Sequence, residues 1–220
     1  MPTSTVEDYL KCILHEERKR PGALVATGAI AAALGVAPGT VTAMMKTLTE
    51  SGLVDYEPYM GVRLTGAGTR LATHVLRRHR LVELFLVRIM GMDWSEVHQD
   101  AEVLEHAVSD RLIERIDEML GHPSADPHGD PIPSAGGLVD EPKHTSLLDC
   151  PPDRELTVAR VIDQRAPFLR LLEQNRLVPG SKAVVESRDE LSETVRVRPE
   201  GGEPIQLGFR AASRILVEVA

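Results

Sequence analysis

The chain has 220 residues, enough for one large domain or two to three small ones at roughly 100–200 residues per domain. Its 42% hydrophobic and 26% charged residues are typical of a soluble globular protein, and no apolar run approaches the ~18 residues of a membrane helix. Cys12 and Cys150 alone cannot build a disulfide framework, and the acidic N-terminus does not resemble a signal peptide. We therefore expect a cytoplasmic protein with no membrane partner.

The net charge of −8 is unevenly distributed along the chain. Residues 1–80 carry 10 Lys and Arg against 7 Asp and Glu, whereas residues 81–121 carry 3 against 10. A mildly basic segment attracts phosphates and a dense acidic one attracts cations. This asymmetry directs attention to nucleic acid for the first segment and to metal ions for the second.

Residues 1–73 predict a winged helix-turn-helix domain. A short helix over residues 27–35, with Thr27 as its N-cap, is followed by a second helix that begins at Pro38 and ends at Gly52. Two short strands then flank the turn at residues 58–61. In this motif the second helix enters the major groove of DNA. The alternative is a helical hairpin that contacts no DNA.

The outward face of the second helix carries the candidate DNA contacts. Ile30, Leu34, Val41, Met45 and Leu48 fall on inward faces at helical spacing. The residues left for DNA are Ala37, Pro38, Thr40, Thr42 and Lys46. Hydroxyls and one Lys suit phosphate contacts with modest reading of base edges.

Residues 74–121 predict two helices separated at residues 91–93, and they contain carboxylates and histidines at metal-ligand spacing. Glu102, Glu105 and His106 share one helix face at i, i+3 and i+4. We expect Ser95 to cap this helix and an apolar stripe to adjoin these residues; the stripe comprises Val97, Ala101, Leu104, Val108, Leu112 and Ile116. His79 and Glu83 form a second pair at i, i+4, and Asp8 lies on the outer side of the first helix.

The candidate ligands are carboxylate oxygens and imidazoles without a thiolate or thioether. This set favours Mn²⁺ or Fe²⁺, although the affinity order alone would favour Zn²⁺ or Cu²⁺. The alternative for each residue taken singly is a solvated acidic helix with incidental histidines. Catalytic motifs such as G-x-S-x-G, H-E-x-x-H or a phosphate loop do not occur, so a metal-dependent hydrolase is the weaker alternative.

Residues 122–152 hold 7 of the 15 prolines and predict an extended linker. Residues 153–220 contain five short β-rich runs and one short helix, typical of a small barrel or sandwich; the runs are LTVARVI, KAVVES, ETVRVRP, IQLGF and RILVEVA. The predicted fold is mainly α with a small β-domain at the C-terminal end.

The sequence resembles the diphtheria toxin repressor family of metal-dependent transcription repressors. The segments that carry the resemblance are EDYL, LGVAPGTVTAMMKTLTESGLV, LTGAGTRLA, RRHRLVELFL, EVHQDAEVLEHAVSD and DPHGDPIP. The resemblance implies a winged helix in residues 1–73, a metal-binding dimerisation domain in 74–121, the linker in 122–152, and a domain similar to an SH3 barrel (FeoA-like) in 153–220.

The resemblance also implies two metal sites. Its primary site corresponds to Asp8, Glu102, Glu105 and His106, where carboxylates at Asp8 and Glu102 match the manganese-responsive branch and iron-responsive members have Met and Cys. Lys11 departs from those manganese members that hold a second ion with a carboxylate at this position. The ancillary site corresponds to His79, Glu83 and His98, with Asp163 or Gln164 from the β-domain. Asp126 and His128 in the DPHG segment are further candidates.

The function implied is that of a homodimeric, Mn²⁺-activated repressor of metal-uptake genes that binds a palindromic DNA operator and is not an enzyme. Fe²⁺ is the alternative activator, with Co²⁺, Ni²⁺, Zn²⁺ and Cd²⁺ as substitutes in vitro. The two rival functions are an Fe²⁺-responsive repressor and the hydrolase.

Overall fold

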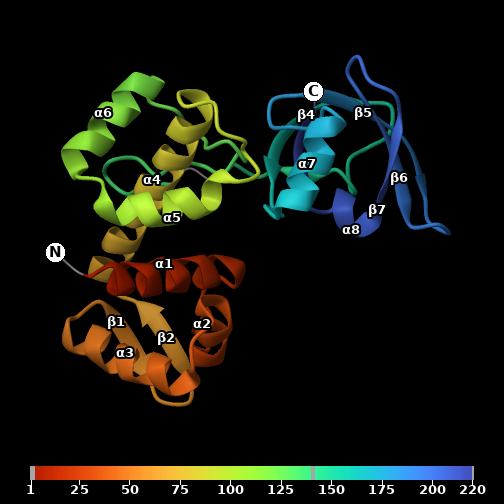
Figure 1. Cartoon of the computed structure of the whole chain (residues 1–220). Helices are drawn as coiled ribbons and strands as arrows, with labels where there is room; N and C mark the ends of the chain where they lie inside the picture. Colours follow the sequence, from red (N-terminus) through yellow and green to blue (C-terminus); the bar gives the residue numbers. More distant parts are fainter. Residues whose placement is uncertain (1–2, 140–141, 220) are drawn as a thin grey trace. The chain divides into compact units, whose positions relative to one another are not determined.

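The computed structural model describes residues 3–139 and 142–219, which divide into two compact units (Figure 1). Unit 1 contains residues 1–79, 105–107 and 133–138. Unit 2 contains the remaining residues. Two helices, α4 (Gly66–Arg88) and α5 (Val97–Ala107), contribute residues to both units.

Unit 1 has the predicted helix-turn-helix and hairpin. Helix α1 (Ser4–Lys19) precedes α2 (Thr27–Leu34) and α3 (Pro38–Glu50), and strands β1 (Val54–Glu57) and β2 (Gly61–Leu64) pair antiparallel. Helix α2 ends at Gly35, whose φ of +65° is the left-handed conformation that glycine adopts at low cost. The predicted cap at Thr27 is wrong, because Thr27 is the first helical residue and Ala26 stands at the N-cap.

An aliphatic core holds the helices of unit 1 against the hairpin. The predicted inward residues Ile30, Val41, Met45 and Leu48 are all buried, and Leu34 is half-buried. Helix α1 lies across α2 and the hairpin (Figure 1) and adds the buried face Tyr9, Leu10, Ile13 and Leu14. Val25 makes an isolated bridge to Val62, which joins the segment before α2 to the second strand of the hairpin.

Among the glycines of unit 1, Gly68 lies closest to another segment of backbone. A Cβ atom at this position would lie 2.0 Å from the carbonyl oxygen of Leu53. We therefore expect Gly68→Ala to lower the free energy of unfolding by about 1–3 kcal/mol, the usual cost of overpacking. The control is Gly66→Ala on the same helix, whose Cβ would meet nothing nearer than Arg70 at 3.6 Å. Equal urea midpoints for the two variants would contradict this prediction.

Unit 2 contains a six-stranded antiparallel sheet in the order β3-β8-β4-β5-β6-β7. The strands are β3 (Thr145–Ser146), β4 (Glu155–Val161), β5 (Lys182–Asp189), β6 (Thr194–Pro199), β7 (Ile205–Gly208) and β8 (Ile215–Val219). All five predicted β-runs are confirmed, as is the short helix α7 (Ala166–Gln174); a further turn of helix, α8 (Phe209–Ala212), follows β7. Register shifts in β4 and β5 mark bulges, which increase the twist of a sheet.

The helical part of unit 2 has one break more than predicted. Helix α5 ends at Ala107, and a separate helix α6 (Asp110–Leu120) begins after Ser109, whose hydroxyl accepts a hydrogen bond from the amide of Leu112. This break changes the helical register, so Ile113 is buried while Leu104 and Leu112, expected in the apolar stripe, are exposed. The predicted cap at Ser95 is also wrong, because α5 begins two residues later with Glu96 at its N-cap.

Residues 122–152 are not simply an extended linker, contrary to the prediction. Leu147 and Cys150 are fully buried in the core of the sheet, and Ile132 packs with α4, α5 and α6. The amide of Val161 donates to the carbonyl of His128, and a Cβ on Gly129 would lie 2.0 Å from the carbonyl oxygen of Ala159. Residues 128–129 are therefore packed against β4. The high content of proline and glycine did not indicate this packing, because a few buried apolar side chains are enough to anchor the described parts of residues 122–152.

Within the described residues, no single helix is long and apolar enough to cross a membrane; the pair α2 and α3, bent by 112°, passes such a test only when taken together.

Candidate metal centre

Asp8, Glu105 and His106 come together in unit 1, with one ligand atom from each lying within 4.8 Å of the others. The Nε2 atom of His106 lies 2.9 Å from Asp8 Oδ1 and 3.4 Å from Glu105 Oε1. The Glu105 side chain is fully buried, whereas Asp8 and His106 are partly accessible. A buried carboxylate beside a second carboxylate and an imidazole is costly unless cations compensate its charge.

Two cationic or protonatable groups already contact Glu105. Lys11 Nζ donates to Glu105 Oε1 at 2.6 Å, and His79 Nδ1 lies 2.6 Å from Glu105 Oε2. The Lys11 side chain is itself mostly buried. A divalent ion held by Asp8, Glu105 and His106 would therefore approach a carboxylate whose oxygens both have partners.

Sequence reasoning missed Glu7 and Arg78 at this site. Glu7 Oε2 lies 2.7 Å from His106 Nδ1, and Glu7 Oε1 lies 3.3 Å from Arg78 Nη2. Glu7 immediately precedes Asp8, but no spacing in the sequence marks it; its burial in the first turn of α1 identifies it in the structure, because a buried carboxylate needs a partner. Burial alone would lower the pKa of His106, but Glu7, Glu105 and Asp8 outweigh burial and raise this pKa above its ordinary value.

A second acidic cluster lies in unit 2, where Glu83, Asp126 and His128 are all buried. His128 Nδ1 lies 3.8 Å from Glu83 Oε2 and 3.9 Å from Asp126 Oδ1. These separations are too long for hydrogen bonds but suit one ion with ligand distances of about 2.0–2.2 Å. Burial raises the pKa of Asp126 well above its usual value, the negative charges of Asp130 and Glu83 raise it further, and Arg80 opposes them.

The imidazole of His128 is oriented for such an ion. Its Nε2 lies 2.9 Å from the carbonyl oxygen of Trp94, and the Trp94 ring stacks on the imidazole. Because a carbonyl only accepts, Nε2 carries the proton and Nδ1 keeps a lone pair. Among the described residues this Nδ1 has no hydrogen-bond partner, so an unsatisfied buried nitrogen is directed toward two carboxylates.

Of the other predicted ancillary residues in unit 2, His98 lies beside Glu83, whereas Asp163 and Gln164 pair with other residues. His98, half-exposed, lies 3.2 Å from Glu83 and 3.6 Å from Glu102. The Asp163 carboxylate accepts from its neighbour Arg165, which lowers its pKa. Gln164 donates to Asp130 at 2.7 Å. Glu102 belongs to unit 2, and His79 to unit 1. The membership of Glu102 in the primary set, and of His79 in the ancillary set, therefore stays a prediction.

The predicted DNA contacts lie at the start and outer face of α3. Ala37, Pro38, Thr40 and Lys46 are exposed, and Thr42 is half-buried. The Thr42 hydroxyl donates its proton to the carbonyl of Pro38, so in this conformation it can only accept a further hydrogen bond. The side chains of the other four residues are accessible to solvent.

Comparison with known families gives a consistent result along the chain. Residues 1–62 match the iron-dependent repressor N-terminal DNA-binding domain, and residues 65–134 match the iron-dependent repressor metal-binding and dimerisation domain. Residues 145–219 match the FeoA domain. A solved structure described as a manganese-dependent transcriptional repressor in complex with manganese is 40% identical, with a TM-score of 0.86 over 98% of this chain and 100% of that chain. The chain belongs to the diphtheria toxin repressor family.

Other relatives agree with membership in the diphtheria toxin repressor family. A structure of ScaR with bound Zn²⁺ is 36% identical with a TM-score of 0.76, over 97% of this chain and 98% of that chain. The regulator MntR of Oceanobacillus iheyensis is 36% identical over 56% of this chain and 81% of its own length. A transcriptional regulator of Methanocaldococcus jannaschii is 38% identical over 52% of this chain and 90% of its own length. These relatives are transcriptional regulators, so the family is not one of enzymes. The matched domains and the similarity to the 40% identical structure confirm the expected fold class.

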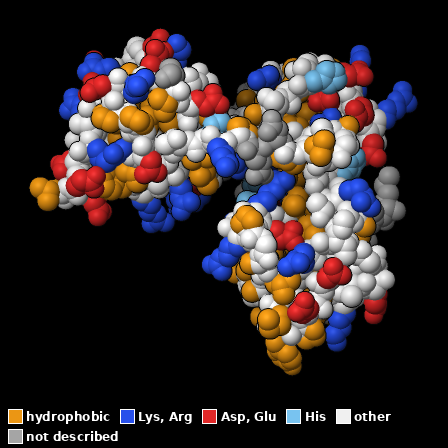
Figure 2. All heavy atoms as spheres, turned by 180° about the vertical axis from the view of Figure 1, so that it is seen from behind, with side chains coloured by type: hydrophobic (Ala, Val, Ile, Leu, Met, Phe, Trp, Pro, Cys, Tyr) orange, Lys and Arg blue, Asp and Glu red, His pale blue; other side chains and the backbone are white. Residues whose placement is uncertain are grey.

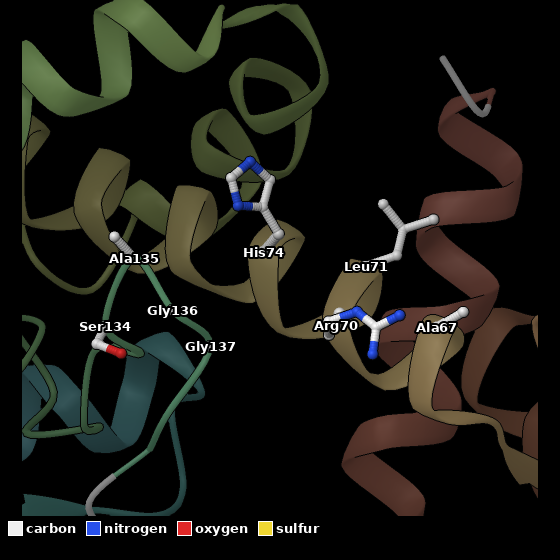
Figure 3. A pocket seen from close by; sticks show the side chains of 8 residues that line it. All are labelled: Ala67, Arg70, Leu71, His74, Ser134, Ala135, Gly136 and Gly137. Carbon is white, nitrogen blue, oxygen red and sulfur yellow. The ribbon is translucent and has the colours of Figure 1, made fainter.

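A hollow of about 370 Å³ in unit 1 lies apart from the carboxylates named above (Figure 3). Arg70 and His74 of α4 line one side, and the segment from Ser134 to Gly137 lines the other. Its lining contains no carboxylate among the described residues, so it offers none of the carboxylate oxygens that Asp8 and Glu105 supply at the candidate metal centre.

Proposed function

We propose that the chain is a homodimeric repressor that binds a palindromic DNA operator near metal-uptake genes when Mn²⁺ occupies a site made by Asp8, Glu102, Glu105 and His106. The observation that carries this proposal is the convergence of Asp8, Glu105 and His106 in unit 1. As a DNA-binding regulator it acts in the cytoplasm, without a membrane partner.

Ligand chemistry supports Mn²⁺ as the activator. Carboxylates and imidazole suit Mn²⁺ better than they suit metals that prefer sulfur ligands, and manganese is the metal named for the 40% identical structure. Fe²⁺ is the runner-up activator. Zn²⁺ and Cd²⁺, which are bound in structures of ScaR, are expected to substitute in vitro, as are Co²⁺ and Ni²⁺.

The switch we propose acts through the contacts between α1 and residues 105–107. Asp8 and Lys11 of α1 already contact His106 and Glu105. An ion shared by Asp8, Glu105 and His106 would fix α1 in one arrangement, and with it α3, whose buried side chains belong to the same core. A shift from 1:99 to 99:1 requires the ion to favour that arrangement by about 5.5 kcal/mol.

The second cluster supports an ancillary ion in unit 2. Glu83, Asp126 and His128 supply its ligands, and the unpaired Nδ1 of His128 is the supporting observation. His79, His98 and Asp163 remain proposed additional ligands; Asp163 would have to leave Arg165 to take part.

Dimerisation is proposed through α5 and α6. Hydrophobic side chains reach the surface in several parts of the chain (Figure 2). Four lie on these two helices, namely Val103, Leu104, Leu112 and Met119. An exposed apolar face of this kind is typical of an interface, and a two-fold dimer binds a two-fold operator.

The test of the proposed function is a gel shift with and without Mn²⁺ and Fe²⁺, run beside a phosphoesterase assay. DNA retention that requires metal, without turnover, is the expected result. Retention that responds to Fe²⁺ but not to Mn²⁺ would favour the runner-up. Turnover without DNA retention would favour the hydrolase.

Lys46 of α3 is expected to contact a DNA phosphate. Lys46→Ala should weaken binding to all sequences about equally and lower the salt slope by about one, because one fewer counterion is released. Lys19→Ala, which removes an exposed lysine of α1 paired with Glu16, is the matched control. If Lys46→Ala changes sequence preference and leaves the salt slope unchanged, Lys46 reads a base instead. Thr40 and Thr42 substitutions should alter sequence preference or positioning.

A further inference from the structure

Glu7 is a buried carboxylate that no ligand set described above uses. It is 6% exposed and lies in the first turn of α1, one residue before Asp8. Its two oxygens have different partners, His106 Nδ1 at 2.7 Å and Arg78 Nη2 at 3.3 Å. Arg78 in turn donates through Nη1 to the backbone carbonyl of Glu105 at 3.1 Å. Glu7 and Arg78 therefore connect α1 to the turn that carries two proposed ligands.

The two nitrogens of His106 have separate roles in this arrangement. Nε2 faces Asp8 Oδ1 at 2.9 Å and Glu105 Oε1 at 3.4 Å, so it is the nitrogen available to an ion held by these carboxylates. Nδ1 faces Glu7. A histidine that binds a metal through one nitrogen donates the proton of the other to a carboxylate, carbonyl or water.

Glu7 is poorly placed to be a ligand itself. Its Oε2 contacts Nδ1, which lies on the other side of the imidazole ring from the metal-facing Nε2. Its Oε1 pairs with the buried Arg78 guanidinium, and a bound metal would have to break that pair. The geometry fits a residue that acts through His106.

We propose that Glu7 is a positioning residue for the metal site. Its carboxylate accepts the Nδ1 proton of His106, which keeps the Nε2 lone pair directed at the ion and fixes the rotation of the ring. Arg78 holds Glu7 in place and joins it to the backbone of Glu105. The inference rests on the proposed function, because it assumes that His106 is a ligand.

The test is Mn²⁺ titration calorimetry on the full chain with Glu7→Ala and Glu7→Gln. Loss of a group that hydrogen-bonds a metal ligand costs about 10–100-fold in affinity, and we expect Glu7→Ala to fall in this range. Glu7→Gln should recover part of the loss, because its side-chain carbonyl still accepts the Nδ1 proton. Glu16→Ala is the matched control, since Glu16 is on the same helix and pairs with Lys19. It should bind like the wild type.

Nitrogen-15 spectra of the His106 ring supply a readout that a general loss of stability would not reproduce. With diamagnetic Zn²⁺ bound, the wild type should show a protonated Nδ1 and a metal-bound Nε2. Glu7→Gln should keep this pattern with a shifted Nδ1 signal, and Glu7→Ala should lose the slowly exchanging Nδ1 proton. If Glu7→Ala fails to fold, Glu7→Gln alone still tests the shift.

Two outcomes separate this inference from the proposed function. Unchanged affinity and an unchanged Nδ1 signal in both Glu7 variants, with binding lost in His106→Ala, would overturn the positioning role and leave the metal site intact. Full Mn²⁺ affinity in His106→Ala and Asp8→Ala would instead overturn the proposed site, and the positioning role with it.

Discussion

Lys11→Met is expected to bind Mn²⁺ at the primary site at least about tenfold more tightly than the wild type, a change of about 1.4 kcal/mol. Lys11 Nζ lies 2.6 Å from the Glu105 oxygen that faces His106 Nε2, so the ammonium and the ion compete for one carboxylate oxygen. Two unit charges 4 Å apart interact by about 4 kcal/mol at an effective dielectric constant of 20. Movement of the Lys11 side chain and partial access of solvent reduce the repulsion between the ammonium and the ion to part of this value. Methionine is chosen because it keeps most of the volume of the lysine side chain.

The same substitution should destabilise the metal-free protein. Glu105 is fully buried, and removing one partner of a buried ion pair costs about 3–5 kcal/mol; the contact with His79 keeps the loss toward the lower end. The Tm of metal-free Lys11→Met should therefore fall, and saturating Mn²⁺ should raise its Tm by more than it raises that of the wild type. Lys19→Met, which breaks an exposed pair on the same helix, should change neither quantity.

Lys11→Glu extends the argument to stoichiometry. A carboxylate at this position replaces a positive charge by an oxygen ligand beside Glu105 and His79, whose atoms already approach each other. We expect titration to count one more Mn²⁺ per chain than in the wild type. If Lys11→Met binds Mn²⁺ with wild-type affinity and Lys11→Glu adds no ion, Lys11 is a structural counter-ion that moves away without cost when metal enters.

The winged helix could be predicted from the sequence because its signals are local. Pro38 and Gly35 punctuate the chain, and Ile30, Val41, Met45 and Leu48 recur at helical spacing, so each side chain's environment follows from its nearest neighbours in sequence. The five β-runs were equally readable from their β-branched residues. In these segments local propensity and tertiary packing favour the same structure.

The break between α5 and α6 could not be predicted from the hydrophobic pattern. The stripe from Val97 to Ile116 continues through Val108 at acceptable helical spacing, and only Ser109 followed by Asp110 signals a new N-terminus. Two-fold assembly offers a reason for the exposed Leu104 and Leu112, because a partner chain can bury what one chain leaves accessible. A single sequence does not distinguish an inward face from an interface.

The metal centre was predictable in part. Spacing identifies Glu105 and His106 as neighbours on one face, but the approach of Asp8 depends on contacts 98 residues apart in the chain. Glu7 and Arg78 were missed for the same reason, since their roles arise only when α1, α4 and α5 pack together. A residue that orients a ligand has no spacing rule, because it can come from any element that reaches the ligand's far side.

Asp8→Met combined with Glu102→Cys is expected to move the response from Mn²⁺ toward Fe²⁺. The change replaces two carboxylate oxygens, which suit Mn²⁺, by a thioether and a thiolate. Loss of groups that merely hydrogen-bond metal ligands already costs about 10–100-fold in affinity, so loss of two ligand oxygens should raise the Mn²⁺ midpoint for DNA binding by at least this much. The Fe²⁺ midpoint should rise less.

The matched control for this exchange is Asp8→Asn with Glu102→Gln, which removes both negative charges and keeps oxygen donors. If donor chemistry sets the preference, the control should weaken both metals without reversing their order, while the sulfur pair changes the ratio of the two midpoints. Titrating operator retention with Mn²⁺ and with Fe²⁺ under anaerobic conditions measures both ratios. An unchanged ratio in the sulfur pair would mean that Asp8 and Glu102 do not set the metal preference, and would direct the search for its cause to the groups around Glu105, where Lys11 and His79 contact the same carboxylate.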